Sequence, residues 1–146
     1  MPKVSDVYME ITKEPTTVNE NDSLETIRKT LLENPVSRCV YVLNHEQRFI
    51  GIITVKEIIT TIGFRSSSRG SQSLSLRNML QYLSKDIKAK DIMRPPIAVK
   101  VEDSFQEAIR LMMLHGYEEI AVVDGENRLI GDLNSYEILN CITLDN

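Results

Sequence analysis

The chain has 146 residues, a formal net charge of -4 and no tryptophan. This length suffices to bury one good core, or two small cores packed together, without disulfides or metals as staples. The negative charge argues against duplex DNA, and against nucleic acid in general, as a partner, because neutralising phosphates requires a basic face.

The rarer residue types exclude several further classes of site. Cys39 and Cys141 stand in apolar contexts without the C-x-x-C spacing, so we expect buried thiols in a reducing compartment. His45 and His115 lie far apart in the pattern, so we expect no metal site and no general base. The chain contains neither a nucleophile elbow nor a Walker loop. We therefore expect no catalytic residues, no enzyme activity and no cofactor.

The location expected from the sequence is the cytoplasm. The N-terminus lacks an apolar signal core, and no apolar run approaches the roughly 20 residues that span a bilayer. We therefore expect no membrane partner.

In chain order, the same series of elements runs twice. Each copy opens with an aspartate close to a methionine, at 6–9 and again at 91–93. A proline and a short strand follow, at 15–18 and at 96–99, and the two prolines are 96 - 15 = 81 residues apart. An internal repeat predicts two copies of one supersecondary unit.

A helix is predicted next in each copy. Asp22 and Asp103 begin the patterns Asp-Ser-Leu-Glu and Asp-Ser-Phe-Gln. In these capping boxes we expect the aspartate to accept a hydrogen bond from an early backbone amide, and the Glu or Gln to reach back. Apolar residues follow at helical spacing and give each helix one buried face. They are Leu24, Ile27 and Leu31 in the first copy and Phe105, Ala108 and Met112 in the second.

Each copy continues with a β-hairpin and ends with an apolar helix. An Asp-Gly pair in the turn at 124–127 is a strong hairpin signal. The closing helices begin beside Thr54 and Asn134. The predicted strands are 40–43 and 49–53, then 120–123 and 129–133, and the closing helices are 55–62 and 135–142.

These elements divide the chain into a first repeat at 1–63, a linker at 64–86 and a second repeat at 87–146. The linker is rich in serine and glycine, and Leu76, Met79, Leu80 and Leu83 then predict a short helix. From Phe64 to Arg94 the chain carries seven basic residues against two acidic ones. This charge either covers a phosphate tail or is a solvated face.

The repeated unit resembles the cystathionine-β-synthase (CBS) domain. Its third strand ends in a glycine, two residues, a hydroxyl residue, two residues and an acid, which reads GIITVKE at 51–57 and GDLNSYE at 131–137. The resemblance covers the chain from about Asp6 to Ile142. It implies an α+β fold of two β-α-β-β-α repeats with small mixed sheets, packed as a pseudo-twofold pair, a Bateman module. It also implies that adenosine phosphates bind in clefts between the two sheets.

Thr54 and Glu57 form the main predicted site. A carboxylate at the start of a helix can accept hydrogen bonds from both hydroxyls of a ribose. A hydroxyl three residues earlier suits a phosphate, because helix N-termini favour anions. Asn134 and Glu137 occupy the same places in the second copy. The resemblance implies that further residues frame the base: Thr16, Thr17, Arg38 and Tyr41 in the first cleft, and Ile97, Ala98, Glu119 and Ala121 in the second.

The two copies depart from the family pattern differently. Both end the motif in glutamate where the family usually has aspartate. Asn134 replaces the hydroxyl residue, and Asp132 adds a carboxylate whose direction the sequence leaves open. If Asp132 and Glu119 both face the cleft, their carboxylates would repel phosphate. We therefore expect the nucleotide in the first cleft, and a neutral adenosine moiety or nothing in the second. In the structural alternative, Thr54 and Asn134 are only helix N-caps completed by the two glutamates.

The leading hypothesis is a regulatory sensor. AMP, ADP, ATP or S-adenosylmethionine would bind between the repeats and shift their packing, which an unidentified regulated protein would read. The alternative is a ligand-free protein interaction module that dimerises through exposed helices. We expect a homodimer of CBS modules. A third possibility is a regulatory piece of a larger enzyme or transporter.

Overall fold

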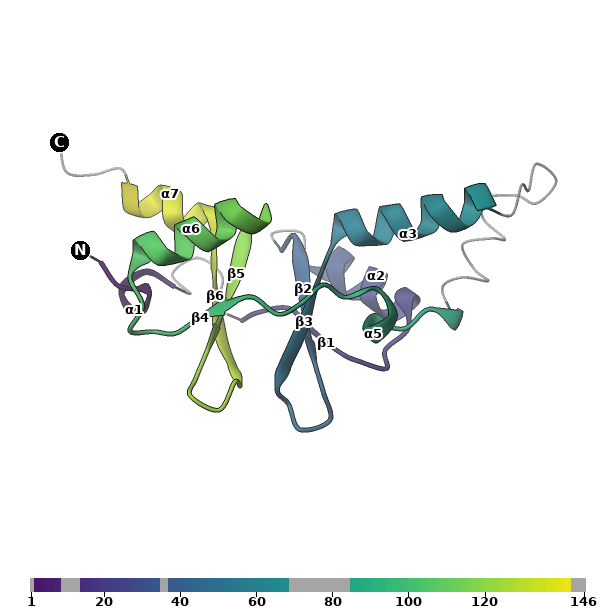
Figure 1. Ribbon diagram of the computed structural model, residues 1–146, viewed down its shortest axis with the longest axis horizontal. Coiled ribbons are helices and arrows are strands. Elements are labelled where there is room, and N and C mark those ends of the chain that lie inside the picture. Colours follow the sequence, from purple (N-terminus) through teal and green to yellow (C-terminus); the bar gives the residue numbers. More distant parts are fainter. Residues whose placement is uncertain (1, 9–13, 35–36, 69–84, 143–146) are drawn as a thin grey trace. The chain divides into compact units, whose positions relative to one another are not determined.

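The computed structural model describes residues 2–8, 14–34, 37–68 and 85–142 (Figure 1). The linker helix predicted around residues 76–83 lies outside these ranges. So does most of the serine-rich stretch before it.

Both repeats contain the predicted elements, each preceded by one further short helix. The first repeat comprises α1 (Val4–Val7), β1 (Thr17–Asn19), α2 (Leu24–Glu33), β2 (Cys39–Leu43), β3 (Phe49–Thr54) and α3 (Val55–Ser68). The second comprises α5 (Ala89–Ile92), β4 (Ala98–Val99), α6 (Phe105–His115), β5 (Glu119–Val123), β6 (Leu129–Asn134) and α7 (Ser135–Ile142). The α3 helix extends beyond the predicted end at residue 62.

Each repeat forms one three-stranded sheet, in the orders β1-β2-β3 and β4-β5-β6. The opening strand is parallel to the middle one, as β1 is to β2 and β4 is to β5. In the second sheet β6 pairs with β5 antiparallel, so parallel and antiparallel neighbours occur together. The predicted α+β class, with two small mixed sheets and helices, is confirmed.

The contacts divide the chain into two units. Unit 1 comprises Met1–Pro15, Glu46–Phe49 and Pro96–Asn146, and unit 2 comprises Thr16–His45 and Ile50–Pro95. Each unit has its own cluster of buried apolar side chains. The helix residues that the sequence assigned to these cores are indeed buried: Leu24, Ile27 and Leu31 in unit 2, and Phe105, Ala108 and Met112 in unit 1.

The short helix that opens each repeat packs in the unit built mainly by the other repeat. Val4 of α1 is fully buried among residues of the second repeat, and Ala89 of α5 is fully buried among residues of the first. The same hydrogen bond holds both: Val4 N–H donates to the Asp103 carbonyl, and Ala89 N–H donates to the Asp22 carbonyl, each at 2.9 Å. In the same way α1 contacts α7 of the second repeat, and α5 contacts α3 of the first. The two repeats thus exchange their opening helices.

The caps of α2 and α6 differ from the prediction. Ser23 and Ser104 are the N-caps, and their hydroxyls accept from the amides of Thr26 and Glu107. The aspartates Asp22 and Asp103 stand one residue earlier and accept from backbone amides of the preceding turn. The assignment of the aspartates as caps is therefore wrong by one residue, because the helix begins one residue later than the aspartate needs.

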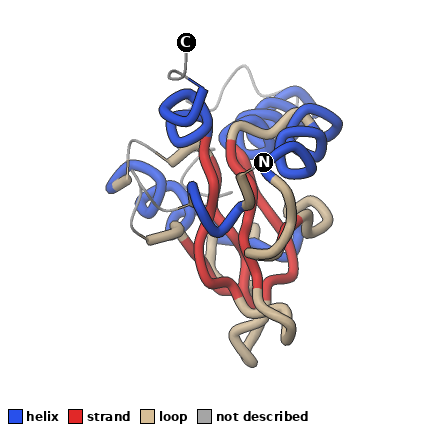
Figure 2. The backbone as a smooth tube through the Cα atoms, turned by 90° about the vertical axis from the view of Figure 1, so that its left-hand side faces the viewer, coloured by secondary structure: helices blue, strands red, loops and turns tan. Residues whose placement is uncertain are grey.

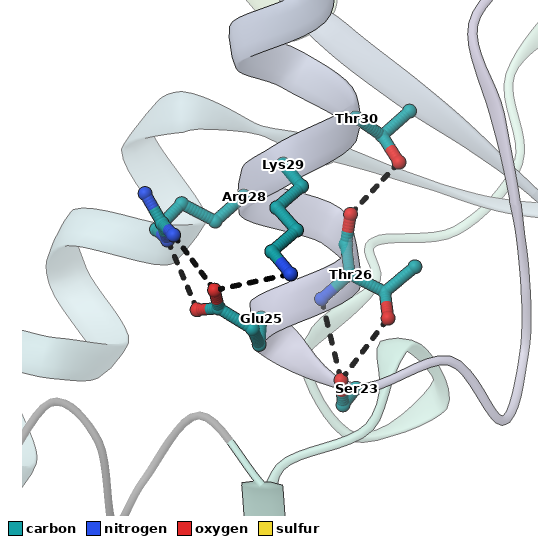
Figure 3. A network of polar contacts seen from close by, with 6 residues as sticks. All are labelled: Ser23, Glu25, Thr26, Arg28, Lys29 and Thr30. Carbon is teal, nitrogen blue, oxygen red and sulfur yellow. Dashed lines mark hydrogen bonds and ion pairs between the residues drawn. The ribbon is translucent and has the colours of Figure 1, made fainter.

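The glutamate in the first turn of α2 does not reach back to the cap. Figure 3 shows Glu25 turned toward Arg28 and Lys29 along the helix surface. Arg28 donates two hydrogen bonds to the Glu25 carboxylate, at 3.0 and 2.7 Å. These hydrogen bonds from Arg28 lower the pKa of Glu25 below its ordinary value. Because both groups are exposed, the pair contributes little to stability.

Hairpin turns and closing helices lie at opposite ends of the strands. In Figure 2 the tan turns stand at one end of the red strands, and the blue closing helices at the other. The left-handed residue of the second turn is Asn127, with φ 63°, within the predicted turn at 124–127. Gln47 has the same conformation in the first turn, with φ 65°. Asn tolerates this region better than most residues.

Candidate functional site

The first candidate site lies where β3 passes into α3, and Thr54 and Glu57 are its centre. Thr54 is the last residue of the strand, and Glu57 lies in the first turn of the helix. One carboxylate oxygen of Glu57, Oε2, accepts from the Thr54 backbone N–H at 2.9 Å and from the Thr54 hydroxyl. The carboxylate therefore reaches back over the helix start, as in the structural alternative, in which Thr54 is an N-cap completed by Glu57.

The other oxygen of Glu57 faces a cation. Arg94 Nη1 lies 3.4 Å from Glu57 Oε1, and 41% of the Arg94 side chain and 14% of the Glu57 side chain are exposed. The main chain of Arg94 is paired with β3, because it exchanges hydrogen bonds with Ile52 at 2.8 and 3.1 Å. A hydroxyl, a carboxylate and a guanidinium thus meet at one end of the strand.

Gly51 permits this arrangement. A Cβ at Gly51 would lie 2.5 Å from Met93 Sδ and 3.0 Å from the Arg94 carbonyl oxygen. The segment carrying Arg94 can approach β3 only because no side chain stands there. The glycine that begins the motif at 51–57 is therefore explained by packing within unit 2.

The residues expected to frame the base lie on the neighbouring strands. The hydroxyls of Thr16 and Ser37 form a buried hydrogen bond at 2.9 Å. The Thr16 carbonyl accepts from the Tyr41 N–H at 2.9 Å, and Thr17 is the register partner of Tyr41. Tyr41 is fully buried, whereas Arg38 is exposed. Because β2 lies between β1 and β3, Tyr41 stands between the threonine pair and the strand that carries Thr54.

The second candidate site occupies one face of the sheet in unit 1. Glu119 is the register partner of Asn134, and Ala121 is the partner of Asp132. Direct partners and alternate residues of antiparallel strands project from the same face, so these four side chains share one face. Ala98 adjoins Ala121 on β4. The pairing thus gives Asp132 the direction that the sequence left open.

This face is polar and buried. Glu119 is 3% exposed, Asn134 is 4% exposed and Asp132 is fully buried. The apolar cluster of unit 1 takes the intervening residues, Ile120 and Leu133, on the other face. Ile97, predicted to frame the base, packs against that apolar cluster.

Asn134 and Glu137 form a complete capping box. Asn134 N–H donates to Glu137 Oε1 at 2.9 Å, and Glu137 N–H donates to Asn134 Oδ1 at 2.9 Å. Glu137 is fully buried. The equivalent acids of the two repeats therefore differ: Glu57 is partly exposed and ion-paired, whereas Glu137 is enclosed in its cap.

Two participants were not predicted as site residues. Arg94 entered the sequence analysis only as one of the basic charges around the linker, and Ser37 did not enter it. The signal for Arg94 was weak, because nothing local relates it to Glu57. Arg94 lies three residues after Asp91 of α5. This spacing brings Arg94 to Glu57 only because α5 packs against the first repeat.

The described ranges contain neither a cluster of metal-binding side chains nor a membrane-spanning helix. No group of three or more His, Cys, Asp or Glu side chains there could hold a metal ion. Within the same ranges, no helix is long and apolar enough to cross a membrane.

Comparisons with known proteins cover most of the chain. The family model of the CBS domain matches residues 4–63 and 89–143. A CBS domain-containing protein from Thermotoga maritima is 32% identical, with a TM-score of 0.78 over 96% of this chain and 93% of its own. CBSX2 from Arabidopsis thaliana, solved in complex with AMP, is 18% identical, with a TM-score of 0.72 over 97% and 96% of the two chains.

A third structure with this fold is the CBS domain pair of the protein MJ0100, solved in complex with 5-methylthioadenosine and S-adenosyl-L-methionine. It is 18% identical, with a TM-score of 0.70 over 97% of this chain and 95% of its own. At this identity the likeness concerns the fold.

Proposed function

Because this chain belongs to the CBS domain family, we propose that it is a regulatory module that binds an adenine nucleotide and catalyses no reaction itself. The observation that carries this proposal is the cluster at the start of α3. Thr54, Glu57 and Arg94 bring a hydroxyl, a carboxylate and a guanidinium together there. These are the groups that a ribose diol and a phosphate require.

Each group has a role in the proposed complex. The Glu57 carboxylate accepts from the ribose hydroxyls, as an acid does in dinucleotide-binding folds. A carboxylate has about four lone-pair positions, so the bonds from Thr54 leave capacity for a ligand. The Thr54 hydroxyl and the first amides of α3 favour a phosphate. Of the four residues expected to frame the base, Thr17 and Arg38 are exposed and can contact it, whereas Thr16 and Tyr41 are buried and support them.

Two relatives with this fold support the ligand class. CBSX2 was solved with AMP, and MJ0100 with S-adenosyl-L-methionine and 5-methylthioadenosine. All three ligands carry an adenosine moiety. This chain keeps the hydroxyl and an acid in its first repeat, at Thr54 and Glu57.

The second repeat is proposed to bind no phosphate. Glu119 and Asp132 place two buried carboxylates on one face of the sheet, and they would repel an anion. Asn134 and Glu137 are committed to each other in the capping box. This site therefore takes an uncharged adenosine moiety or stays empty.

The ligand would act by shifting an equilibrium between two arrangements of the module. A ligand shifts such an equilibrium only as far as its affinities for the two states differ. The partner that reads the shift is a regulated protein, which recognises one arrangement.

Thermal unfolding with a ligand panel tests the proposal. We expect AMP, ADP, ATP or S-adenosylmethionine, but not GTP, to raise the melting temperature. A ligand at about 100 times its Kd stabilises by roughly 2.7 kcal/mol. The variant Thr54→Ala with Glu57→Ala should lose this response. If no adenine compound shifts the unmodified protein at millimolar concentration, the proposal is wrong.

A matched control separates loss of the site from loss of a helix cap. Ser23→Ala with Glu25→Ala removes the N-cap and a first-turn acid of α2 in the same unit. This control should melt earlier than the unmodified protein and still respond to the ligand. An equal loss of response in both variants would place the effect in stability and contradict the site.

A second candidate function is assembly without a ligand. Its supporting observation is that both closing helices expose apolar side chains, Val55 and Ile59 on α3 and Tyr136 and Leu139 on α7. We expect sedimentation to show a homodimer that Ile59→Lys with Leu139→Lys converts to a monomer. A monomer at all concentrations in the unmodified protein would exclude this function.

A further inference from the structure

The ion pair between Arg94 and Glu57 lies at the centre of the first candidate site. Arg94 is held by its main chain, which is hydrogen-bonded to Ile52 on β3. Its guanidinium therefore starts from a fixed point beside the site, and only the side chain has to move. Its partner Glu57 is the acid proposed to hold the ribose.

An uncharged nucleoside meets an unfavourable exchange at this site. To accept the ribose hydroxyls fully, Glu57 would give up part of its interaction with Arg94, and the nucleoside offers the guanidinium no anion in return. A ligand with a phosphate does offer one. A phosphate monoester carries about -1.5 to -2 charges at neutral pH, and the planar guanidinium fork matches its oxygens.

We propose that Arg94 moves from Glu57 to the phosphate of the bound nucleotide, and that this exchange makes the site in unit 2 selective for adenine nucleotides over adenosine. The inference rests on the proposed function, because it names a specificity residue of the same site. In the exchanged state Arg94 pairs with the phosphate and Glu57 with the ribose. Without a ligand, the two side chains neutralise each other.

The sequence provides the arginine for this exchange in only one of the two units. Lys88 and Asp91 of α5 correspond to Lys3 and Asp6 of α1, since both lysine amides donate to the aspartate three residues later at 2.9 Å. Counting on by three residues, the place of Arg94 is taken by Met9, which lies outside the described residues. A methionine supplies no positive charge for a phosphate. The nucleotide selectivity is therefore assigned to unit 2.

Calorimetric titration of AMP and adenosine into the full chain tests the inference. We expect the unmodified protein to bind AMP roughly ten- to a hundredfold more tightly than adenosine, the range expected for a charge-assisted hydrogen bond. Arg94→Gln should lose most of this preference, with AMP binding weakened and adenosine binding unchanged or tighter. Arg94→Lys should restore part of it, because it keeps the charge without the planar fork.

The control is Arg128→Gln. Arg128 also forms an exposed ion pair, with Glu126 at 3.6 Å, but lies in the hairpin turn of unit 1. This variant should keep the unmodified AMP preference, and the melting temperature of each variant verifies folding. A preference retained in Arg94→Gln overturns the inference while the proposed function stands. Equal affinity for AMP and adenosine in the unmodified protein overturns it without any variant. If neither compound binds, this inference is overturned, and the proposed function fails as well only when ADP, ATP and S-adenosylmethionine also do not bind.

Discussion

At Gly51 the packing leaves no room for a side chain. An added Cβ would meet Met93 Sδ at 2.5 Å and the Arg94 carbonyl at 3.0 Å. The sulfur is the far part of a flexible side chain and can move, but the carbonyl belongs to a backbone that is hydrogen-bonded to β3. The same contacts place Arg94 beside Glu57, so this glycine serves both the fold and the site.

We expect Gly51→Ala to destabilise the protein by about 1 to 3 kcal/mol, the usual range for overpacking. The measurement is urea unfolding. Gly63→Ala is the control, because a Cβ there meets nothing within 4 Å, and its exposed position in α3 favours alanine. This control should be neutral or up to about 1 kcal/mol more stable. Equal stability of both variants would contradict the close approach of Met93 and Arg94.

Asp124 gives the hairpin turn of unit 1 a dependence on pH. Its Oδ1 accepts from the amides of Arg128 and Glu126, at 2.9 and 2.8 Å. These backbone hydrogen bonds, from Arg128 first and then Glu126, lower the pKa of Asp124 below its ordinary value. A lowered folded-state pKa stabilises the fold above the unfolded value of about 3.9. That stabilisation disappears as the pH falls through the folded value.

We therefore expect Asp124→Asn to be less stable than the unmodified protein at pH 7. The difference should shrink below about pH 3.9 and vanish once the native aspartate is protonated. Urea unfolding from pH 7 to pH 2.5 measures it. A difference that is the same at both ends would show that the charge of Asp124 contributes nothing to the turn.

At the scale of single elements, helix caps decide where α2 and α6 begin. In both helices the serine hydroxyl accepts from the amide three residues later, and the preceding aspartate holds the turn that leads into the helix. The serine thus caps the helix, and the aspartate before it stabilises the preceding turn. The sequence pattern Asp-Ser is compatible with either residue as the cap, and the φ and ψ of the chain decide between them.

We expect Ser104→Ala to cost about 1 kcal/mol of stability, the typical loss of a serine N-cap. Chemical denaturation measures this change. Ser5→Ala is the control, since Ser5 is exposed inside α1 and caps no helix. It should change stability by no more than about 0.5 kcal/mol. A loss in Ser5→Ala as large as in Ser104→Ala would remove the capping explanation.

At the scale of the whole molecule, the exchange of α1 and α5 ties each repeat to the other. Val4 belongs to the first repeat and is buried in unit 1, whereas Ile87 belongs to the second repeat and is buried in unit 2. One of the places where the chain passes from one unit to the other lies between Pro95 and Pro96, one residue beyond Arg94. A ligand that displaces Arg94 would therefore act beside one of the segments that join the two units.

Because of this exchange, a mutation in the first repeat should loosen the second. We expect Val4→Ala to cost about 1 to 3 kcal/mol through the cavity it leaves, and to speed hydrogen exchange in β5 and α6. The amides of β1 and β2 should keep their protection. Ile87→Ala should have the opposite effect and speed hydrogen exchange in unit 2. Faster exchange confined to the mutated repeat would contradict the exchanged helices.

Much of the fold could be predicted from the sequence. The repeat, the strands and the buried faces of α2 and α6 follow from apolar periodicity, which is a local property of the chain. The motifs at 51–57 and 131–137 carried the family resemblance and led to Thr54 and Glu57. Hydrogen bonds between these two residues span only three positions, so the pattern already contains them.

The tertiary structure decided the rest of the site. Arg94 reaches Glu57 only because α5 packs against the other repeat, and no local pattern relates residues that far apart. The direction of Asp132 follows from its register with Ala121, since a shift of one residue would reverse it. The sequence by itself thus determined the elements and the family. Long-range packing and strand register determined which charges face one another, because the energies that select them act between distant parts of the chain.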